Sequence, residues 1–250
     1  MSATTHRVGH GEHPVIALHG WFGDARSFEP MEPWLSRDTF SYVFMDYRGY
    51  GARWDVVGAY TIDEIAIDIL SLADELGFDS FSLIGHSMGG MVLEKVAILA
   101  PGRIRRLVAI APVPATGMRY DASTRDVLDR ACGDASLRRA IIDRSTGGRL
   151  PASWLDWKVA YSLSTSTPEA FAAYLRAWTD TDVSAQVVDR HRMKLLVGEH
   201  DPVFDHALMT RTYLRLHPQA SCEVLRNAGH YPMNETPLAL VSAIEAFLGA

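Results

Sequence analysis

The chain has 250 residues, of which 48% are hydrophobic and 22% charged, and its net charge is −6 at pH 7. This length and composition are typical of one compact globular domain with a substantial core and room for an insertion. The acidic balance argues against a polyanionic partner, so we expect no nucleic-acid binding.

Local composition argues against a secreted or membrane-spanning protein, and against a fold held by disulfides or zinc. Residues 1–11 contain no apolar segment of the kind that a secretory signal needs, and no stretch is apolar for long enough to span a bilayer. Cys132 and Cys222 are far apart and lack metal-ligand spacing, so neither a disulfide framework nor a zinc site is predicted. We expect a cytoplasmic protein with no membrane partner.

Short apolar runs alternate with helical patterns along most of the chain, which predicts βαβ units and a parallel sheet. The runs are bounded by Gly, Pro or Asp and are expected to be buried strands with helices on both faces. They are Val15–Leu18, Tyr42–Met45, Phe81–Ile84, Leu107–Ala111, Leu195–Val197 and, with a weaker pattern, Cys222–Leu225.

The clearest helix follows Thr61. Thr61 and Glu64 have capping-box spacing, the apolar residues between Ile62 and Leu76 share one face, and Gly77 is suited to the C-terminal cap. Similar helical patterns cover Met88–Leu99 and Leu238–Leu248.

The alternation stops between residues 112 and 183, which contain helical patterns but no convincing strand. We expect this segment to be a helical cap inserted into a core domain of residues 1–111 and 184–250. An insertion at the carboxyl end of a central strand lies where ligands bind in open α/β sheets. Its aromatic residues are therefore candidates for a substrate pocket, together with Phe22: Trp154, Trp157, Tyr161 and Trp178.

Gly85-His86-Ser87-Met88-Gly89 follows an apolar run and opens a helical pattern. A serine at such a strand-to-helix turn adopts a strained backbone conformation, and flanking glycines relieve the crowding. The turn exposes the hydroxyl beside a helix N-terminus, whose partial positive charge favours a developing oxyanion. Ser87 is therefore the candidate nucleophile.

This motif resembles the nucleophile elbow of the α/β-hydrolase superfamily. Four other segments resemble motifs of that family and occur in the family's order: His19–Gly23, Asp46–Gly51, Gly198–Asp201 and Gly229-His230. The resemblance runs from about Val15 to the C-terminus, apart from the insertion. It implies an α/β-hydrolase fold with a mostly parallel sheet of about seven or eight strands, and N-terminal antiparallel strands that are shortened here.

A serine hydroxyl needs a neighbouring base to take its proton. Chain order in the family is serine, acid, histidine, and His230 alone among the ten histidines fits this order with room for a final helix. Asp201 follows the strand Leu195–Val197 on a turn, where its carboxylate would orient the imidazole. Glu199 and Asp205 are alternatives for the acid.

Backbone amides are expected to complete the site as an oxyanion hole. Met88, which follows the nucleophile, should supply one N–H group, and Trp21 the other, with Phe22 as second choice. The segment Asp46–Gly51 is interpreted as a structural turn.

A triad with an oxyanion hole favours attack on an acyl carbon, so we expect hydrolysis of a small-molecule ester or lactone without metal or cofactor. Ser87 argues against haloalkane dehalogenase and epoxide hydrolase activity, since those relatives use an aspartate there. The alternatives are a carbon–carbon bond hydrolase, a cofactor-free perhydrolase, a lyase, or a ligand receptor that retains the triad. The oligomeric state stays open.

Overall fold

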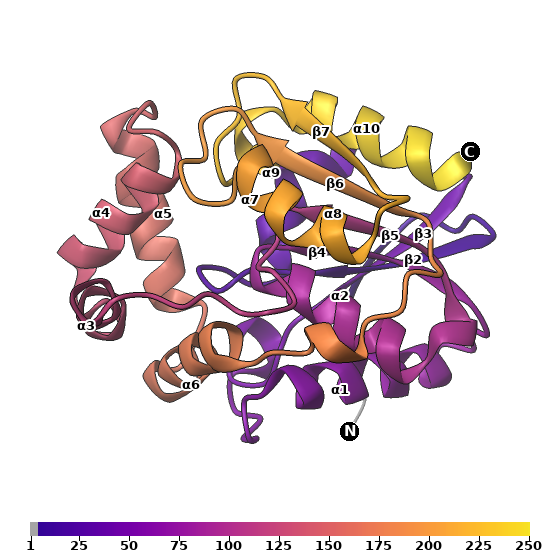
Figure 1. Cartoon of the computed structure of the whole chain (residues 1–250), viewed down its shortest axis with the longest axis horizontal. Coiled ribbons are helices and arrows are strands. Elements are labelled where there is room, and N and C mark those ends of the chain that lie inside the picture. Colours follow the sequence, from indigo (N-terminus) through magenta and orange to yellow (C-terminus); the bar gives the residue numbers. More distant parts are fainter. Residues whose placement is uncertain (1–4) are drawn as a thin grey trace.

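The computed structural model describes residues 5–250, and its centre is a seven-stranded sheet (Figure 1). The strand order is β1-β3-β2-β4-β5-β6-β7, and all neighbours are parallel except β1, which runs antiparallel to β3. The strands are β1 (Thr5–Val8), β2 (His13–Leu18), β3 (Phe40–Met45), β4 (Phe81–His86), β5 (Ile104–Ile110), β6 (Met193–Gly198) and β7 (Ser221–Leu225).

Helices cover both faces of the sheet, which explains why its central strands are mostly apolar and buried; β4 is buried at every position. On one face lie α1 (Ile62–Glu75), α2 (Met88–Leu99), α7 (His206–Arg211) and α8 (Tyr213–Leu216). On the other lie α9 (Pro232–Glu235), α10 (Pro237–Gly249) and the 3₁₀ segment η1 (Ala25–Trp34). Short 3₁₀ turns occur at Gly51–Arg53, Pro101–Arg103 and Ser184–Gln186.

Four helices separate β5 from β6 and lie beyond one end of the sheet, at the left of Figure 1. They are α3 (Ala122–Arg130), α4 (Ala135–Ser145), α5 (Ala152–Ser164) and α6 (Pro168–Asp180). We call these four helices the cap. All of them fall within the segment in which the sequence predicts helices and no strand.

The predicted mostly parallel sheet of about seven or eight strands is confirmed, with seven strands in the described residues. Strand β1 was not predicted, because its four residues, Thr-His-Arg-Val, have too little apolar patterning to mark an edge strand. It provides one antiparallel strand at the N-terminal edge. Within residues 5–250, no helix has the length and apolarity needed to cross a membrane.

Candidate active site

Ser87 lies in the turn between β4 and α2 with φ 54° and ψ −115°, a strained conformation for a non-glycine residue. The turn is held by its backbone: Ser87 N–H donates to the carbonyl of Ile110 (2.9 Å), and Ser87 C=O accepts from the amides of Gly90 and Val113 (both 2.9 Å). The end of β5 thus fixes the turn that presents the hydroxyl.

Two glycines beside Ser87 have no room for a side chain. A Cβ on Gly85 would lie 2.3 Å from the carbonyl oxygen of Gly89, and a Cβ on Gly89 would lie 2.5 Å from that of Leu18. These contacts are with backbone atoms, which cannot rotate away. Close packing of α2 against the sheet therefore requires the glycines that the sequence motif contains.

The side chains of Ser87, His230 and Asp201 form one chain of hydrogen bonds. His230 Nδ1 donates to Asp201 Oδ2 (2.6 Å), because an ionised carboxylate can only accept. His230 Nε2 is then the acceptor for the Ser87 hydroxyl, at 3.0 Å. All three side chains are buried, and they come from three loops at the carboxyl ends of β4, β6 and β7.

Asp201 is held as a carboxylate. Burial alone would raise its pKa, but the His230 imidazole and the amides of Phe204 and Val203 outweigh burial and lower the pKa of Asp201 below its usual value. Its Oδ1 accepts from both amides at 3.0 Å, which leaves Oδ2 for the imidazole.

The two alternative acids are engaged elsewhere. Glu199 accepts from the amide of Asn227 (3.0 Å), and Asp205 caps the start of α7 by accepting from the amide of Leu208 (2.7 Å). Asp201 is therefore the carboxylate that the fold brings to His230.

The loop that carries His230 is fixed by a residue that the sequence analysis missed, Glu235. Its carboxylate accepts from the amides of Gly229 (2.8 Å) and Tyr231 (3.1 Å), on either side of His230, and pairs with Arg149 (2.6 Å). A helix-forming acid a few residues after a Gly-His turn is the only sequence signal for this role, and it is a weak one.

His86 was also given no role in the sequence analysis. Its Nε2–H donates to the carbonyl of His230 (2.8 Å), and its Nδ1 is buried without a hydrogen-bond partner among the described residues. Burial, followed by the nearby His230, lowers the pKa of His86 well below its usual value. It is a neutral donor that supports the His230 backbone.

Three backbone amides, in the turn after Ser87 and in the loop after β2, are candidates for an oxyanion hole. Met88 is the first residue of that helix, so its N–H has no partner in the preceding turn. Among residues 5–250 the amides of Met88, Trp21 and Phe22 donate to no protein acceptor. They are free to bind an oxyanion, and the geometry leaves both Trp21 and Phe22 available as the second donor.

A mostly apolar cavity of about 290 Å³ opens in front of Ser87. The core contributes Trp21, Phe22, His86, Ser87, Asp201, Val203, Phe204, His230 and Tyr231, and the cap with its leading loop contributes Tyr120, Thr124, Val127, Leu128, Ile141, Arg144, Ser145 and Trp178. The cavity thus lies between the end of the sheet and the cap, at the edge where ligands bind in this class of fold.

Comparison with known proteins decides the family. The family model described as "Alpha/beta hydrolase family" matches residues 15–244, which is most of the chain. The chain belongs to the α/β-hydrolase family.

The curated relatives of this α/β hydrolase include esterases and lactonases at low identity. It is 26% identical over 244 residues to 3-oxoadipate enol-lactonase 2 of Acinetobacter baylyi, covering 96% of this chain and 90% of the relative. It is 27% identical over 247 residues to the pimeloyl-[acyl-carrier protein] methyl ester esterase of Photobacterium profundum, covering 94% of each.

Among solved structures, an esterase from Exiguobacterium antarcticum superimposes with a TM-score of 0.86 at 19% identity, covering 98% of this α/β hydrolase and 95% of the esterase. At that identity the likeness concerns the fold.

Only two of the predicted pocket aromatics, Phe22 and Trp178, line the cavity of this α/β hydrolase. The prediction differs from the structure for Trp154, Trp157 and Tyr161, which lie on α5 and are not part of the cavity lining. Trp154 packs against Tyr231 with 5.8 Å between ring centroids, and Trp157, 48% exposed, stacks on Tyr161. Aromatic content could not reveal which way α5 faces.

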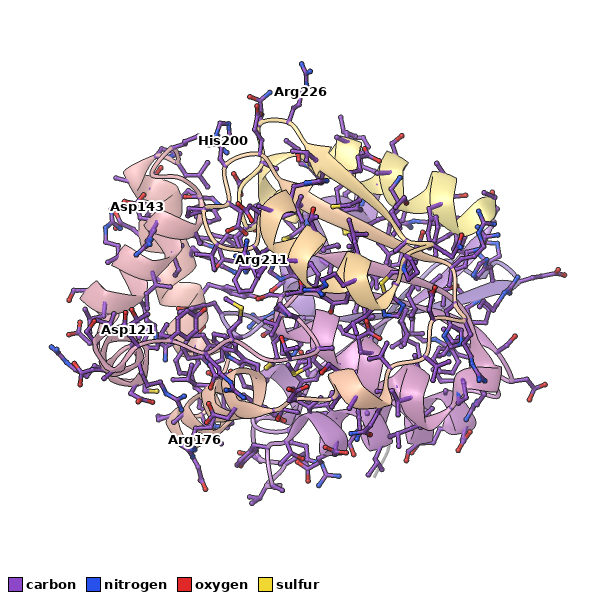
Figure 2. The ribbon with its side chains drawn as sticks, in the orientation of Figure 1. Asp121, Asp143, Arg176, His200, Arg211 and Arg226 are labelled. Atoms are coloured by element: carbon purple, nitrogen blue, oxygen red, sulfur yellow. The ribbon has the colours of Figure 1, made fainter. Side chains whose placement is uncertain are left out.

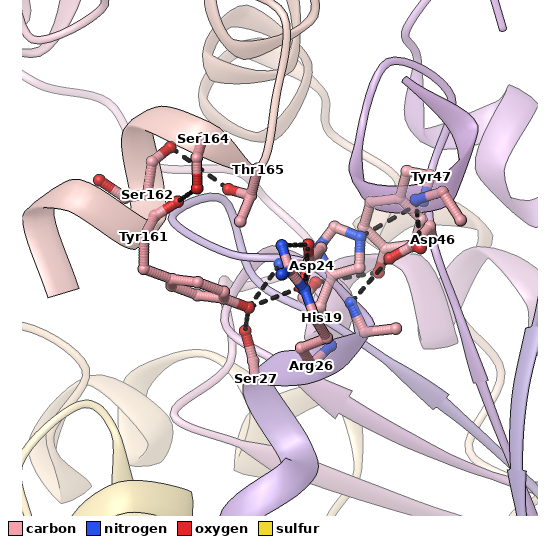
Figure 3. Close-up of polar contacts among 12 residues, drawn as sticks. His19, Asp24, Arg26, Ser27, Asp46, Tyr47, Tyr161, Ser162, Ser164 and Thr165 are labelled. Atoms are coloured by element: carbon pink, nitrogen blue, oxygen red, sulfur yellow. Dashed lines mark hydrogen bonds and ion pairs between the residues drawn. The ribbon is translucent and has the colours of Figure 1, made fainter. Parts of the chain in front are cut away.

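Tyr161 instead connects the cap to the loop after β2 (Figure 3). Its hydroxyl donates to Asp24 Oδ1 (2.6 Å) and lies 3.1 Å from the Ser27 hydroxyl. Asp24 also pairs with Arg26 (2.6 Å). The contact ties α5 to the segment that begins with the proposed oxyanion residues.

The Asp46–Gly51 segment is a structural turn in this α/β hydrolase. Asp46 accepts from the amides of Ala25 and Ala52, both at 2.8 Å, so its carboxylate is used to join two loops. Within residues 5–250, no three His, Cys, Asp or Glu side chains converge in a way that could hold a metal ion.

Proposed function

We propose that this protein is a serine hydrolase that cleaves a small-molecule carboxylic ester or lactone through an acyl-enzyme. The observation that carries the proposal is the hydrogen-bonded chain of Ser87, His230 and Asp201 facing an apolar cavity. The two curated relatives support this class of substrate, since one is named as an enol-lactonase and the other as a methyl ester esterase.

In the proposed reaction, His230 Nε2 takes the Ser87 proton while the serine oxygen attacks the acyl carbon. The amides of Met88 and Trp21 stabilise the negative oxygen of the tetrahedral intermediate. His230, now an imidazolium paired with Asp201, returns the proton to the leaving alkoxide. Water then attacks the acyl-enzyme with His230 again as the base, and the acid is released.

The test is covalent labelling by a fluorophosphonate probe, together with hydrolysis of short-chain aryl esters. Wild-type protein should be labelled and should turn over the esters. Ser87→Ala should lose labelling, and its kcat should fall by about 10⁴-fold or more, because the nucleophile is removed. Thermal unfolding of the same sample shows whether Ser87→Ala is folded. Labelling that survives in a folded Ser87→Ala protein contradicts the nucleophile assignment.

A further inference from the structure

Among residues 5–250, Arg144 is the one arginine or lysine in the wall of the cavity, and it lies in the last turn of α4. Neighbouring arginines are paired with acids: in the cap, Arg125 pairs with Asp180 and Arg139 with Asp156, and between α4 and α5, Arg149 pairs with Glu235. Arg144 has no carboxylate within 4.0 Å in residues 5–250 and donates no side-chain hydrogen bond there. Arg144 is exposed while it lines the cavity, and its guanidinium carries five N–H donors.

No carboxylate that the described residues place in the lining is free to pair with Arg144. Asp201 is the one carboxylate that residues 5–250 contribute to the lining, and both of its oxygens are occupied by His230 and by loop amides. The free charge that a ligand meets is therefore positive.

Two further residues of the lining, Trp178 and Tyr120, carry polar groups. Trp178 is 5% exposed, and its buried Nε1–H has no acceptor among the described residues. Tyr120 packs edge-on against Trp178, with 6.1 Å between ring centroids. Burial, then the charge of Asp201, raises the pKa of Tyr120 to about 12 against the opposing effect of Arg144, so its hydroxyl remains a donor.

Most of the remaining lining is apolar and includes Val127, Leu128, Ile141, Val203 and Phe204. The cavity therefore combines three features: the Ser87 hydroxyl, an apolar wall and an exposed arginine. A ligand that matches all three has a scissile acyl carbon, a short hydrocarbon chain and a terminal anion with a planar pair of acceptors.

We propose that Arg144 selects esters or lactones whose acyl part ends in a carboxylate, that is, derivatives of dicarboxylic acids. A guanidinium binds a carboxylate through two parallel hydrogen bonds, which gives direction as well as attraction. This inference rests on the proposed function, because it places the acyl carbon at Ser87. Arg144 is in this view a specificity residue and takes no part in bond cleavage.

The test compares monomethyl adipate, which is anionic, with methyl hexanoate, a neutral ester of the same chain length. Wild-type kcat/KM should favour the anionic ester by about tenfold or more, and added salt should reduce this preference. Arg144→Gln should lower kcat/KM for monomethyl adipate by at least about tenfold and change that for methyl hexanoate less than about threefold. Arg144→Lys should be intermediate, because an ammonium cannot form the bidentate pair.

Arg176→Gln is the matched control, since Arg176 is also a cap arginine but does not line the cavity and points outward in Figure 2. It should leave both rates unchanged. If Arg144→Gln lowers the two rates equally, or leaves the rate for monomethyl adipate as it was, the proposal is wrong.

Binding separates this proposal from the proposed function. Ser87→Ala should bind monomethyl adipate more tightly than methyl hexanoate, as measured by tryptophan fluorescence, and Arg144→Gln in that background should remove the difference. Equal binding of the two esters overturns the role of Arg144. Arg144-dependent binding in a protein that shows neither probe labelling nor turnover would contradict the hydrolase function and leave the anion site standing.

Discussion

At the scale of single residues, the side chains of the candidate triad differ in how firmly they are fixed. Asp201 uses both carboxylate oxygens, one for His230 and one for two loop amides. The Ser87 hydroxyl has a single side-chain contact, to His230, and owes its position to the strained turn. The Asp201 carboxylate therefore fixes the orientation of the His230 imidazole. Replacing Asp201 tests the chain of hydrogen bonds most directly.

We predict that Asp201→Asn lowers kcat on aryl esters by about 10³- to 10⁴-fold with little change in KM. If the asparagine oxygen faces His230, its NH₂ group meets the amides of Val203 and Phe204, which are donors too. If the amide is turned around, its NH₂ group favours the His230 tautomer that cannot accept the Ser87 proton. Steady-state kinetics measure the effect.

Glu199→Gln is the matched control, because among the described residues Glu199 accepts a hydrogen bond from the Asn227 amide and lies 3.6 Å from His200, away from His230. It should retain activity within about threefold of wild type, as expected for a substitution outside the proposed machinery. A larger loss in Glu199→Gln than in Asp201→Asn would reassign the acid.

Gly20 gives a second prediction at this scale. A Cβ there would lie 2.9 Å from His86 Nδ1 and 3.1 Å from Ser87 Cβ, and His86 is held in place by its bond to His230. Gly20→Ala should therefore lower kcat/KM by about tenfold or more and destabilise the fold by about 1–3 kcal/mol. Gly102→Ala, where a Cβ meets nothing within 4 Å, should change neither quantity.

At the scale of elements, the cap is assembled around a buried arginine. Arg138 is 2% exposed and donates to the carbonyls of Ala131 (2.7 Å), Cys132 (3.0 Å) and Ser162 (2.7 Å). Its guanidinium also lies 3.8 Å from the ring centroid of Phe171. One side chain of α4 thus joins the end of α3, helix α5 and helix α6.

We predict that Arg138→Met destabilises the protein by about 2–4 kcal/mol, because three carbonyls lose their donor. Urea unfolding measures this change, and faster proteolysis within residues 112–183 would locate it in the cap. Arg139→Met removes an exposed ion pair with Asp156 and should cost less than about 1 kcal/mol. Equal effects of the two substitutions would show that Arg138 does not hold the cap together.

How much of the fold the sequence could predict also depends on the element. The central strands and α1 follow from local patterns, since their burial or capping uses neighbouring residues; Thr61 caps α1 by accepting from the Glu64 amide. The face that α5 presents depends on how the cap packs on the core, which no local pattern encodes. Ser87, Asp201 and His230 could be predicted because each follows the end of a strand. Glu235 could not, because its role depends on how its helix packs beside the His230 loop.

At the scale of the whole molecule, the junction of cap and core contains a buried lysine. Lys158 is 1% exposed, and its Nζ lies 4.6 Å and 4.7 Å from the ring centroids of Tyr231 and Tyr161. Among residues 5–250 it has no carboxylate within 4.0 Å. Burial lowers the pKa of Lys158 to about 7, with Asp24 opposing the shift.

We predict that Lys158→Met is more stable than wild type at pH 6.5 and that this advantage shrinks by pH 9.5. Below pH 7 the lysine is charged in both states, so wild type bears the full cost of burying the charge. Between about pH 7 and 10.5 only the unfolded chain keeps the proton, so the stability of wild type rises with pH relative to the variant.

Urea unfolding of both proteins at the two pH values measures the difference, and Lys194→Met controls for the loss of a lysine elsewhere. An advantage that is the same at both pH values would contradict a depressed pKa for Lys158.

Trp21 belongs to two parts of the molecule at once. Its amide is the proposed second oxyanion donor, while its indole N–H donates to the carbonyl of Phe171 in α6 (2.8 Å) and its ring stacks on that of Phe171, with 4.2 Å between ring centroids. The cap is therefore not an interchangeable module. A chimera that takes its cap from another member of the family must supply a carbonyl and an aromatic ring where Phe171 stands, or the grafted protein will misplace the amide that we propose as an oxyanion donor.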